Sequence, residues 1–157
     1  MKKIIFLVLF FALQSFSQNT FPKFFLKNLE EETVSNSNFN EPDKIYVFAF
    51  WATWCAPCIQ ELDAINDVYF DWKEELNIEV IAISIDDART SKRVKPMVNG
   101  RGWDYTILLD INQDLKRGLS IANPPYTVVV KNGEIVHVQS GHTPGSENEL
   151  FEKLKSL

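Results

Sequence analysis

The stretch that decides the fold reads IYVFAFW over residues 45–51 and ATWCAPC over residues 52–58. Its first seven residues are all apolar or aromatic, which is typical of a strand covered on both faces of a sheet. Apolar residues then recur at steps of three and four, which predicts a long amphipathic helix, at positions Ile59, Leu62, Ile65, Tyr69, Trp72 and Leu76. Pro57 suits the first turn of that helix, because a proline there loses no helical hydrogen bond. The stretch therefore predicts strand, cysteine-bearing loop and helix.

Strand and helix patterns alternate through the rest of the chain. Strands are predicted over residues 80–86, 105–109, 126–130 and 135–139, and helices over residues 90–99, 113–119 and from 146 onward. Asn132-Gly133 indicates a hairpin between the last two strands, because both residues tolerate positive φ. Ser146 with Glu149 predicts a capping box at the last helix. This order predicts an α/β fold with a mixed central β-sheet flanked by helices and a C-terminal β-hairpin and helix.

The N-terminal part is weakly patterned apart from its first residues. Residues 21–29 predict a short strand or edge segment, followed by a turn at the acidic residues 30–32. The chain of 157 residues suits one domain, and its 45% hydrophobic content is enough for a core. The net charge of −5 argues against nucleic acid or an anionic membrane as partner.

The first 17 residues have the pattern of a secretory signal peptide. Lys2 and Lys3 precede an unbroken apolar run over residues 4–13, and the small Ser15 and Ser17 would stand at −3 and −1 of a cut before Gln18. Ten apolar residues are too few to span a bilayer, which needs about 20. We therefore expect export, to the periplasm if the host is Gram-negative, with a mature domain over residues 18–157. An uncleaved anchor on the membrane surface is the alternative.

The only two cysteines, Cys55 and Cys58, have the C-x-x-C spacing of a redox dithiol. Cys55 is expected at the start of the helix, where unpaired N–H groups and the helix dipole favour a thiolate. Cys58 is expected one turn further on, partly covered, and able to resolve a mixed disulfide formed at Cys55. A bridge across two residues closes almost no loop, so the pair looks chemical rather than structural.

Other chemistries of such a pair are less consistent with the sequence. A zinc site would need two more ligands, and the only histidines, His137 and His142, begin 79 residues after Cys58. His137 alternates with two valines and is expected to face solvent. Asp86 is expected to end a strand and cap a loop rather than to bind metal. We predict no bound cofactor or metal, with a peroxiredoxin-like peroxidase and a non-catalytic metallochaperone as the alternatives.

The segment FWATWCAPC over residues 50–58 resembles the active site of thioredoxin-like proteins. Pro125 followed by Lys131-Asn132-Gly133 has the spacing of the cis-proline strand and hairpin of that fold. The Trp-Ala-Thr-Trp-Cys form, the signal peptide and the extra segment between residues 86 and 109 resemble the TlpA/ResA group of extracytoplasmic reductases, some of which serve cytochrome c maturation. The resemblance implies a cis Pro125 beside the cysteines, protein thiols and disulfides as partners, and a membrane electron donor. A monomer is expected.

The sequence departs from the thioredoxin pattern in two places. Ala49 and Ala82 stand where typical thioredoxins carry a buried Asp and a Lys, so that proton-handling pair is missing. Glu61, one helical turn after Cys58, is the candidate substitute, and the TlpA/ResA group has a glutamate there. Pro124 lacks the backbone N–H that the residue before the cis-proline gives to substrate.

One further residue belongs to the expected site. Trp54 directly precedes Cys55, and we expect it to form an exposed rim of the substrate surface.

Overall fold

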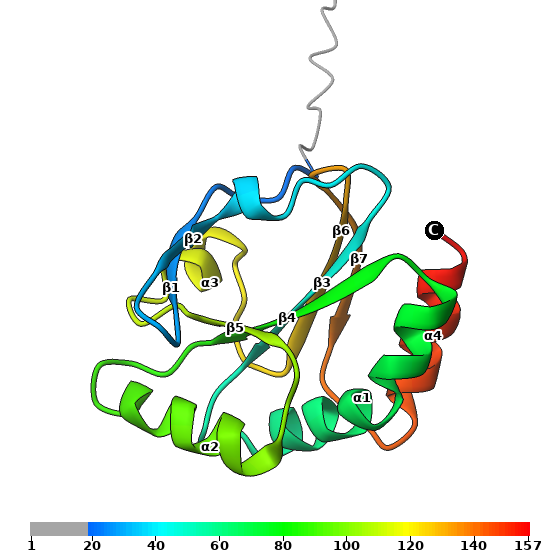
Figure 1. Ribbon diagram of the computed structural model, residues 1–157. Helices are drawn as coiled ribbons and strands as arrows, with labels where there is room; N and C mark the ends of the chain where they lie inside the picture. Colours follow the sequence, from blue (N-terminus) through cyan, green and yellow to red (C-terminus); the bar gives the residue numbers. More distant parts are fainter. Residues whose placement is uncertain (1–18) are drawn as a thin grey trace, which may run out of the picture.

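A seven-stranded mixed sheet forms the centre of the computed structural model, which describes residues 19–157 (Figure 1). The predicted signal peptide lies outside these residues. The strands are β1 (Phe25–Asn28), β2 (Thr33–Ser35), β3 (Ile45–Trp51), β4 (Ile78–Ser84), β5 (Thr106–Leu109), β6 (Tyr126–Lys131) and β7 (Glu134–Ser140). The helices are α1 (Ala56–Glu75), α2 (Val94–Arg101), α3 (Asp114–Gly118) and α4 (Ser146–Lys155), with short 3-10 turns at Asn36–Asn38 and Ser91–Arg93. None of these helices is long and apolar enough to cross a membrane.

The strands lie side by side in the order β2-β1-β5-β4-β3-β6-β7. The pairs β3–β4 and β4–β5 are parallel, whereas β6 runs antiparallel to β3 and forms the hairpin with β7. Every residue of β3 is buried, because β3 has a strand on each side and covered faces above and below. The carboxyl ends of β3 and β4 consequently meet at one edge of the sheet, where the loop with the cysteines begins.

Helices α1, α2 and α4 lie on one side of the sheet and α3 on the other (Figure 1). The indole of Trp72 in α1 stacks on the ring of Phe151 in α4, with 5.1 Å between centroids. On the opposite face, Phe21, Phe24, Phe39 and Phe48 form an aromatic cluster that ties the N-terminal segment to β3. Such pairs add packing energy beyond the area that they bury. Aromatic packing therefore holds α1 against α4 on one side of the sheet and the N-terminal segment against β3 on the other.

The architecture confirms the predicted thioredoxin-like fold, with differences at individual elements. The three-residue β2 was not predicted. The helix predicted over residues 90–99 was expected to be interrupted by Pro96, but Pro96 stands in the first turn of α2, where no backbone partner is lost. The capping box predicted at Ser146 is wrong: Gly145 is the N-cap, and Ser146 bonds to His142 Nδ1 instead.

Candidate active site

Cys55 and Cys58 lie at the start of α1 and form a disulfide, with 5.3 Å between their Cα atoms. Cys55 is the N-cap residue, and its sulfur accepts a hydrogen bond from the backbone N–H of Cys58 at 3.3 Å. Pro57 stands in the first turn, as its position in the sequence predicts. Cys55 is 6% exposed, whereas Cys58 is fully buried. Of the two cysteines, Cys55 is therefore the one that retains exposed surface.

The loop before Cys55 is fastened to the end of β4. The carboxylate of Asp86, which is buried, accepts hydrogen bonds from the Thr53 backbone N–H at 2.8 Å and the Thr53 hydroxyl at 2.6 Å. The Ser84 hydroxyl donates a third hydrogen bond to it at 2.8 Å. Asp86 thus caps a loop, as expected. The loop that it caps is the one that carries Cys55. Sequence reasoning missed this role, although an Asp directly after a buried parallel strand at the same sheet edge was the available signal.

Trp54 follows Thr53 and is the most exposed residue of the loop. Its side chain is 57% exposed, which agrees with the predicted rim position. The Cys55 backbone N–H donates to the Ala52 carbonyl at 3.0 Å, so the loop turns tightly just before the disulfide. Trp54 directly precedes Cys55 in the sequence, and its indole is exposed to a binding partner.

Glu61 is a buried carboxyl group one helical turn after Cys58. It is 3% exposed, and its only hydrogen bond comes from the Thr127 hydroxyl to Oε1 at 3.3 Å. The other oxygen, Oε2, is buried without a partner within the described residues. Burial raises the pKa of Glu61 to about 7, and the hydrogen bond from Thr127 offsets part of that rise. Glu61 can therefore gain or lose a proton near neutral pH.

The sheet beneath Glu61 carries methyl groups at the positions where the thioredoxin pattern has charges. Ala49 in β3 pairs with Ala82 in β4 on one side and with Thr127 in β6 on the other, and all three are fully buried. Paired residues point to the same face of a sheet, and Thr127 reaches Glu61 of α1 from that face. Glu61 of α1 is thus a titratable group that lies against this uncharged part of the sheet.

Pro124 and Pro125 are joined by a cis peptide bond, the geometry that the resemblance implied for Pro125. The Pro125 carbonyl accepts a hydrogen bond from the Gly141 N–H at 2.9 Å, which ties the proline loop to the end of β7. Thr127, which contacts Glu61, is two residues further along. The proline pair therefore lies at the end of the sheet where Thr127 contacts Glu61. Pro124 offers a backbone carbonyl there but no N–H.

The two histidines line one cavity between β7 and α4, and neither cysteine lines it. Across residues 19–157 no group of three or more His, Cys, Asp or Glu side chains is arranged to hold a metal ion. The expectation that His137 faces solvent is wrong, since His137 is half-buried while Val136 and Val138 are exposed. The reason is that α4 packs over that face of β7, where His137 and Lys153 line one cavity. Burial and Lys153 lower the pKa of His137.

Comparisons with known proteins agree with this geometry. The AhpC/TSA family matches residues 18–139. Thiol-disulfide oxidoreductase ResA from Oceanobacillus iheyensis is 33% identical over 76% of this chain and 62% of its own length. The ResA protein from Halalkalibacterium halodurans is 29% identical over 85% of this chain and 72% of its own length. The chain thus spans about two thirds of the length of these relatives.

A solved structure extends the comparison to the fold. A thioredoxin-like protein from Porphyromonas gingivalis superimposes with a TM-score of 0.77 at 40% identity, covering 89% of this chain and 92% of that one. The chain therefore belongs to the AhpC/TSA family, in which its fold and its relatives place it with the ResA-type thiol–disulfide oxidoreductases.

Proposed function

We propose that this chain reduces disulfides of selected proteins outside the cytoplasm, using Cys55 and Cys58 as its redox pair. The observation that carries the proposal is the unequal pair at the start of α1. Cys55 at the N-cap retains a small exposed surface, Cys58 is fully buried one turn away, and a titratable carboxyl group lies one turn further on. The ResA relatives, which are named as thiol-disulfide oxidoreductases, support the reaction type.

The reaction passes two electrons from the reduced pair to the substrate. The Cys55 thiolate attacks one sulfur of a substrate disulfide, forming a mixed disulfide and releasing the other substrate sulfur as a thiolate. Cys58 then loses its proton and attacks Cys55 Sγ. This step forms the Cys55–Cys58 disulfide and releases the second substrate thiolate, and both thiolates take up protons. A dithiol donor, expected at the membrane, returns the pair to the reduced state.

Glu61 is proposed as the proton carrier for Cys58. Residues three apart on a helix are neighbours, with about 5–6 Å between their Cβ atoms. A carboxyl group with a pKa near 7 can take the proton from the Cys58 thiol and return it when the pair is reduced again. The orphaned Oε2 has the free lone pairs for this transfer. Ala49 and Ala82 on the sheet beneath carry no charge, so Glu61 would be the carboxyl group that changes the pH dependence of this step.

The proline loop and Trp54 are proposed to form the substrate surface. A bound chain that adds a strand beside Pro125 would normally gain a backbone N–H from the preceding residue. Pro124 cannot donate it, so an arbitrary unfolded chain binds with one hydrogen bond fewer. The exposed indole of Trp54 offers an apolar contact instead. We therefore expect slow reaction with generic disulfides and faster reaction with partners that fit the rim.

Reduction of insulin disulfides and consumption of hydrogen peroxide, measured side by side, distinguish this function from that of a peroxidase. The reduced protein, kept reduced by dithiothreitol, should accelerate the reduction of insulin slowly but measurably over the uncatalysed rate. Hydrogen peroxide should disappear no faster than with the dithiothreitol alone. Protein with both cysteines alkylated is the control for each reaction. Fast peroxide turnover without insulin reduction would mean that the pair serves a peroxidase.

Export is proposed from the first 17 residues, with the mature domain over residues 18–157 and the periplasm as its location in a Gram-negative host. We expect mass spectrometry of protein isolated from the native host to show a chain that begins at Gln18. The matched control is the same gene expressed with Lys2 and Lys3 replaced by Glu, which should remain uncut because the positive region is lost. A mature product that still begins at Met1 or Lys2 contradicts cleavage.

A further inference from the structure

A run of basic residues lies beside the redox pair and has no part in the chemistry described above. Residues 89–101, here called the basic segment, hold five of the chain's 16 Lys and Arg and none of its 21 Asp and Glu. The five are Arg89, Lys92, Arg93, Lys95 and Arg101. The segment comprises the 3-10 turn Ser91–Arg93 and helix α2. The five residues give the segment itself a formal charge of +5 in a chain with net charge −5, and three of them pair with acidic residues outside the segment.

Contacts near both ends of the basic segment connect it to the elements that carry the active site. Asp86, three residues before its start, holds Thr53, which stands two residues before Cys55. At its far end, Arg101 pairs with Asp63 of α1, and the Trp103 indole N–H donates to the same carboxylate at 2.8 Å. Asp63 lies five residues after Cys58, a rise of about 7.5 Å along the helix axis. The segment therefore runs along the same edge of the molecule as the disulfide.

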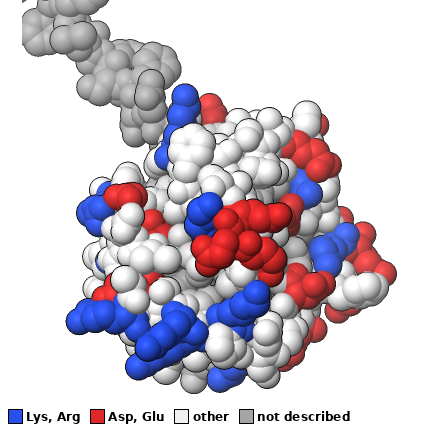
Figure 2. All heavy atoms as spheres, turned by 60° about the vertical axis from the view of Figure 1, so that its left-hand side comes forward, with Lys and Arg blue, Asp and Glu red and all other residues white. Residues whose placement is uncertain are grey.

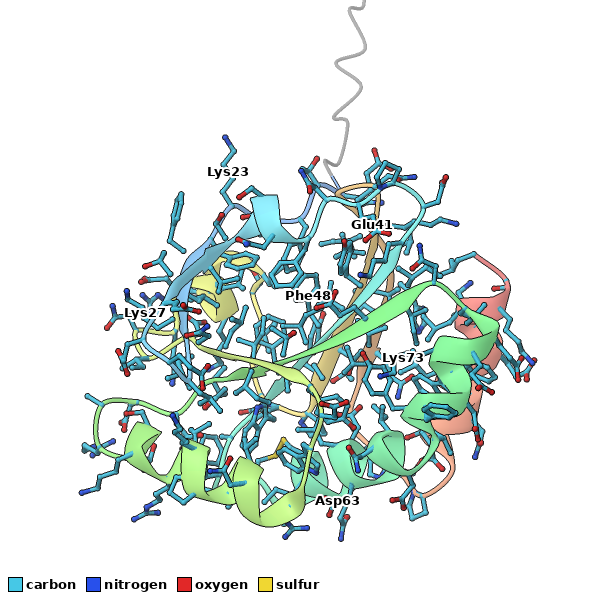
Figure 3. All side chains as sticks on the ribbon, viewed as in Figure 1. Lys23, Lys27, Glu41, Phe48, Asp63 and Lys73 are labelled. Atoms are coloured by element: carbon cyan, nitrogen blue, oxygen red, sulfur yellow. A yellow bond between two sulfur atoms is a disulfide. The ribbon has the colours of Figure 1, made fainter. Side chains whose placement is uncertain are left out.

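The figures show the same arrangement. Figure 3 places Asp63 at the end of the molecule where α1 and α2 approach each other, and Lys23 and Lys27 far from it. In Figure 2 the Lys and Arg side chains gather on the lower part of the face that carries α2. The large acidic group in this view lies above the basic one. A partner that reaches Cys55 would therefore meet a positive surface on this side.

Part of this charge is free for a partner. Arg89 pairs with Asp87, Lys95 lies 3.7 Å from Glu30, and Arg101 pairs with Asp63. Lys92 and Arg93 are exposed and make no ion pair within residues 19–157. Exposed charges at the rim of an interface raise the association rate with a complementary surface and discriminate against like-charged partners.

We infer that the basic segment is a docking surface for an acidic protein that presents its disulfide to Cys55. The inference rests on the proposed function, because the partner is the disulfide substrate. A protein partner is favoured over a membrane, since a membrane bound to this edge would cover the cysteines that must meet another sulfur. Lys92 and Arg93 select substrates whose disulfide is flanked by Asp and Glu, while Trp54 and Cys55 contact the disulfide region itself.

Two matched peptides test this inference on the reduced, full mature domain. Both contain one intramolecular disulfide; one has four Glu flanking it and the other has four Lys. Wild-type protein should reduce the Glu peptide with a kcat/KM about tenfold higher at low salt, and the preference should shrink as salt rises. In Lys92→Glu/Arg93→Glu protein the preference should reverse. Lys23→Glu/Lys27→Glu protein carries the same change in net charge at a distant site and should keep the wild-type preference.

Each other outcome overturns the inference. Equal rates for the two peptides in wild-type protein, or equal effects of the two double variants, would show that the segment does not select substrates. Loss of pelleting with anionic phosphatidylglycerol vesicles in Lys92→Glu/Arg93→Glu protein, with peptide rates unchanged, would identify a membrane contact instead. If wild-type protein reduces the small disulfide of 5,5′-dithiobis(2-nitrobenzoate) but neither peptide, the docking inference is overturned and the proposed function is not. If it reduces none of the three, the proposed function fails as well.

Discussion

Cys58→Ala protein should accumulate a stable mixed disulfide between Cys55 and a substrate protein, whereas Cys55→Ala protein should form none. The physical reason is the difference in exposure, since Cys55 reaches the surface at the helix N-cap and Cys58 is fully buried. Without Cys58 the attack on the substrate still occurs, but no second thiol releases the product. Disulfide exchange in Cys55→Ala protein should fall by about a thousandfold or more, to the background rate.

The adduct is measured by non-reducing electrophoresis and by mass spectrometry of the linked peptides. Ser84→Ala protein, which keeps both cysteines, is the matched control for loss of a small polar group near the site and should trap nothing. An adduct that maps to Cys58 in Cys55→Ala protein would reverse the assignment of the two sulfurs. Adducts of equal yield in both cysteine variants would mean that the buried sulfur is accessible in solution and that burial does not divide their roles.

Glu61→Gln protein should have a different pH dependence of stability from wild type. The unfolded carboxyl group titrates near 4.5 and the folded one near 7, so the folded state holds a proton to higher pH. Wild-type stability therefore falls as pH rises from about 4.5 to about 7, and the loss is complete above that range. A rise in pKa of this size corresponds to about 3 kcal/mol. The neutral Gln removes this loss and should make the variant more stable than wild type at pH 8.

Urea unfolding of the disulfide form between pH 4 and 8 measures this effect, with Glu74→Gln as control. Glu74 lies on the exposed face of the same helix, so its replacement should leave the pH profile unchanged. In the reduced protein, Glu61→Gln should also slow the step in which Cys58 releases substrate from its mixed disulfide with Cys55, because the Cys58 proton loses its acceptor. Superimposable stability profiles and equal release rates for wild type and Glu61→Gln would reduce Glu61 to a structural residue.

The centre of the fold could be predicted because its signals are local. The seven apolar residues of β3 and the steps of three and four along α1 each determine an element without knowledge of the rest of the chain. The polar three-residue β2 carries no such pattern, and it exists because β1 offers it a free edge. Ser146 fails as a cap because the left-handed Gly145 occupies the N-cap position and its own N–H bonds to Glu147.

In the site, too, relations between residues close in the sequence could be predicted, and contacts between distant residues could not. Cys55, Pro57, Cys58 and Glu61 lie on one helix, so their spacing alone predicts that they are neighbours. The contact between Thr127 and Glu61 joins residues 66 apart in the chain, and the contact between Asp86 and Thr53 joins residues 33 apart. Such pairs depend on the register of the sheet, which a single sequence does not determine. His137 was misplaced for this reason too, since which face of β7 is covered depends on where α4 packs.

An equilibrium redox titration of the Cys55–Cys58 pair against glutathione or dithiothreitol buffers tests the central claim most directly. The fraction of disulfide is followed by thiol alkylation and mass spectrometry in the proposed mature domain, residues 18–157. A reductant of protein disulfides should give one two-electron transition at a potential nearer thioredoxin, about −270 mV, than the oxidant DsbA, about −120 mV. A potential near that of DsbA, with fast oxidation of reduced unfolded chains, or a disulfide that never equilibrates with the buffer, would contradict the account.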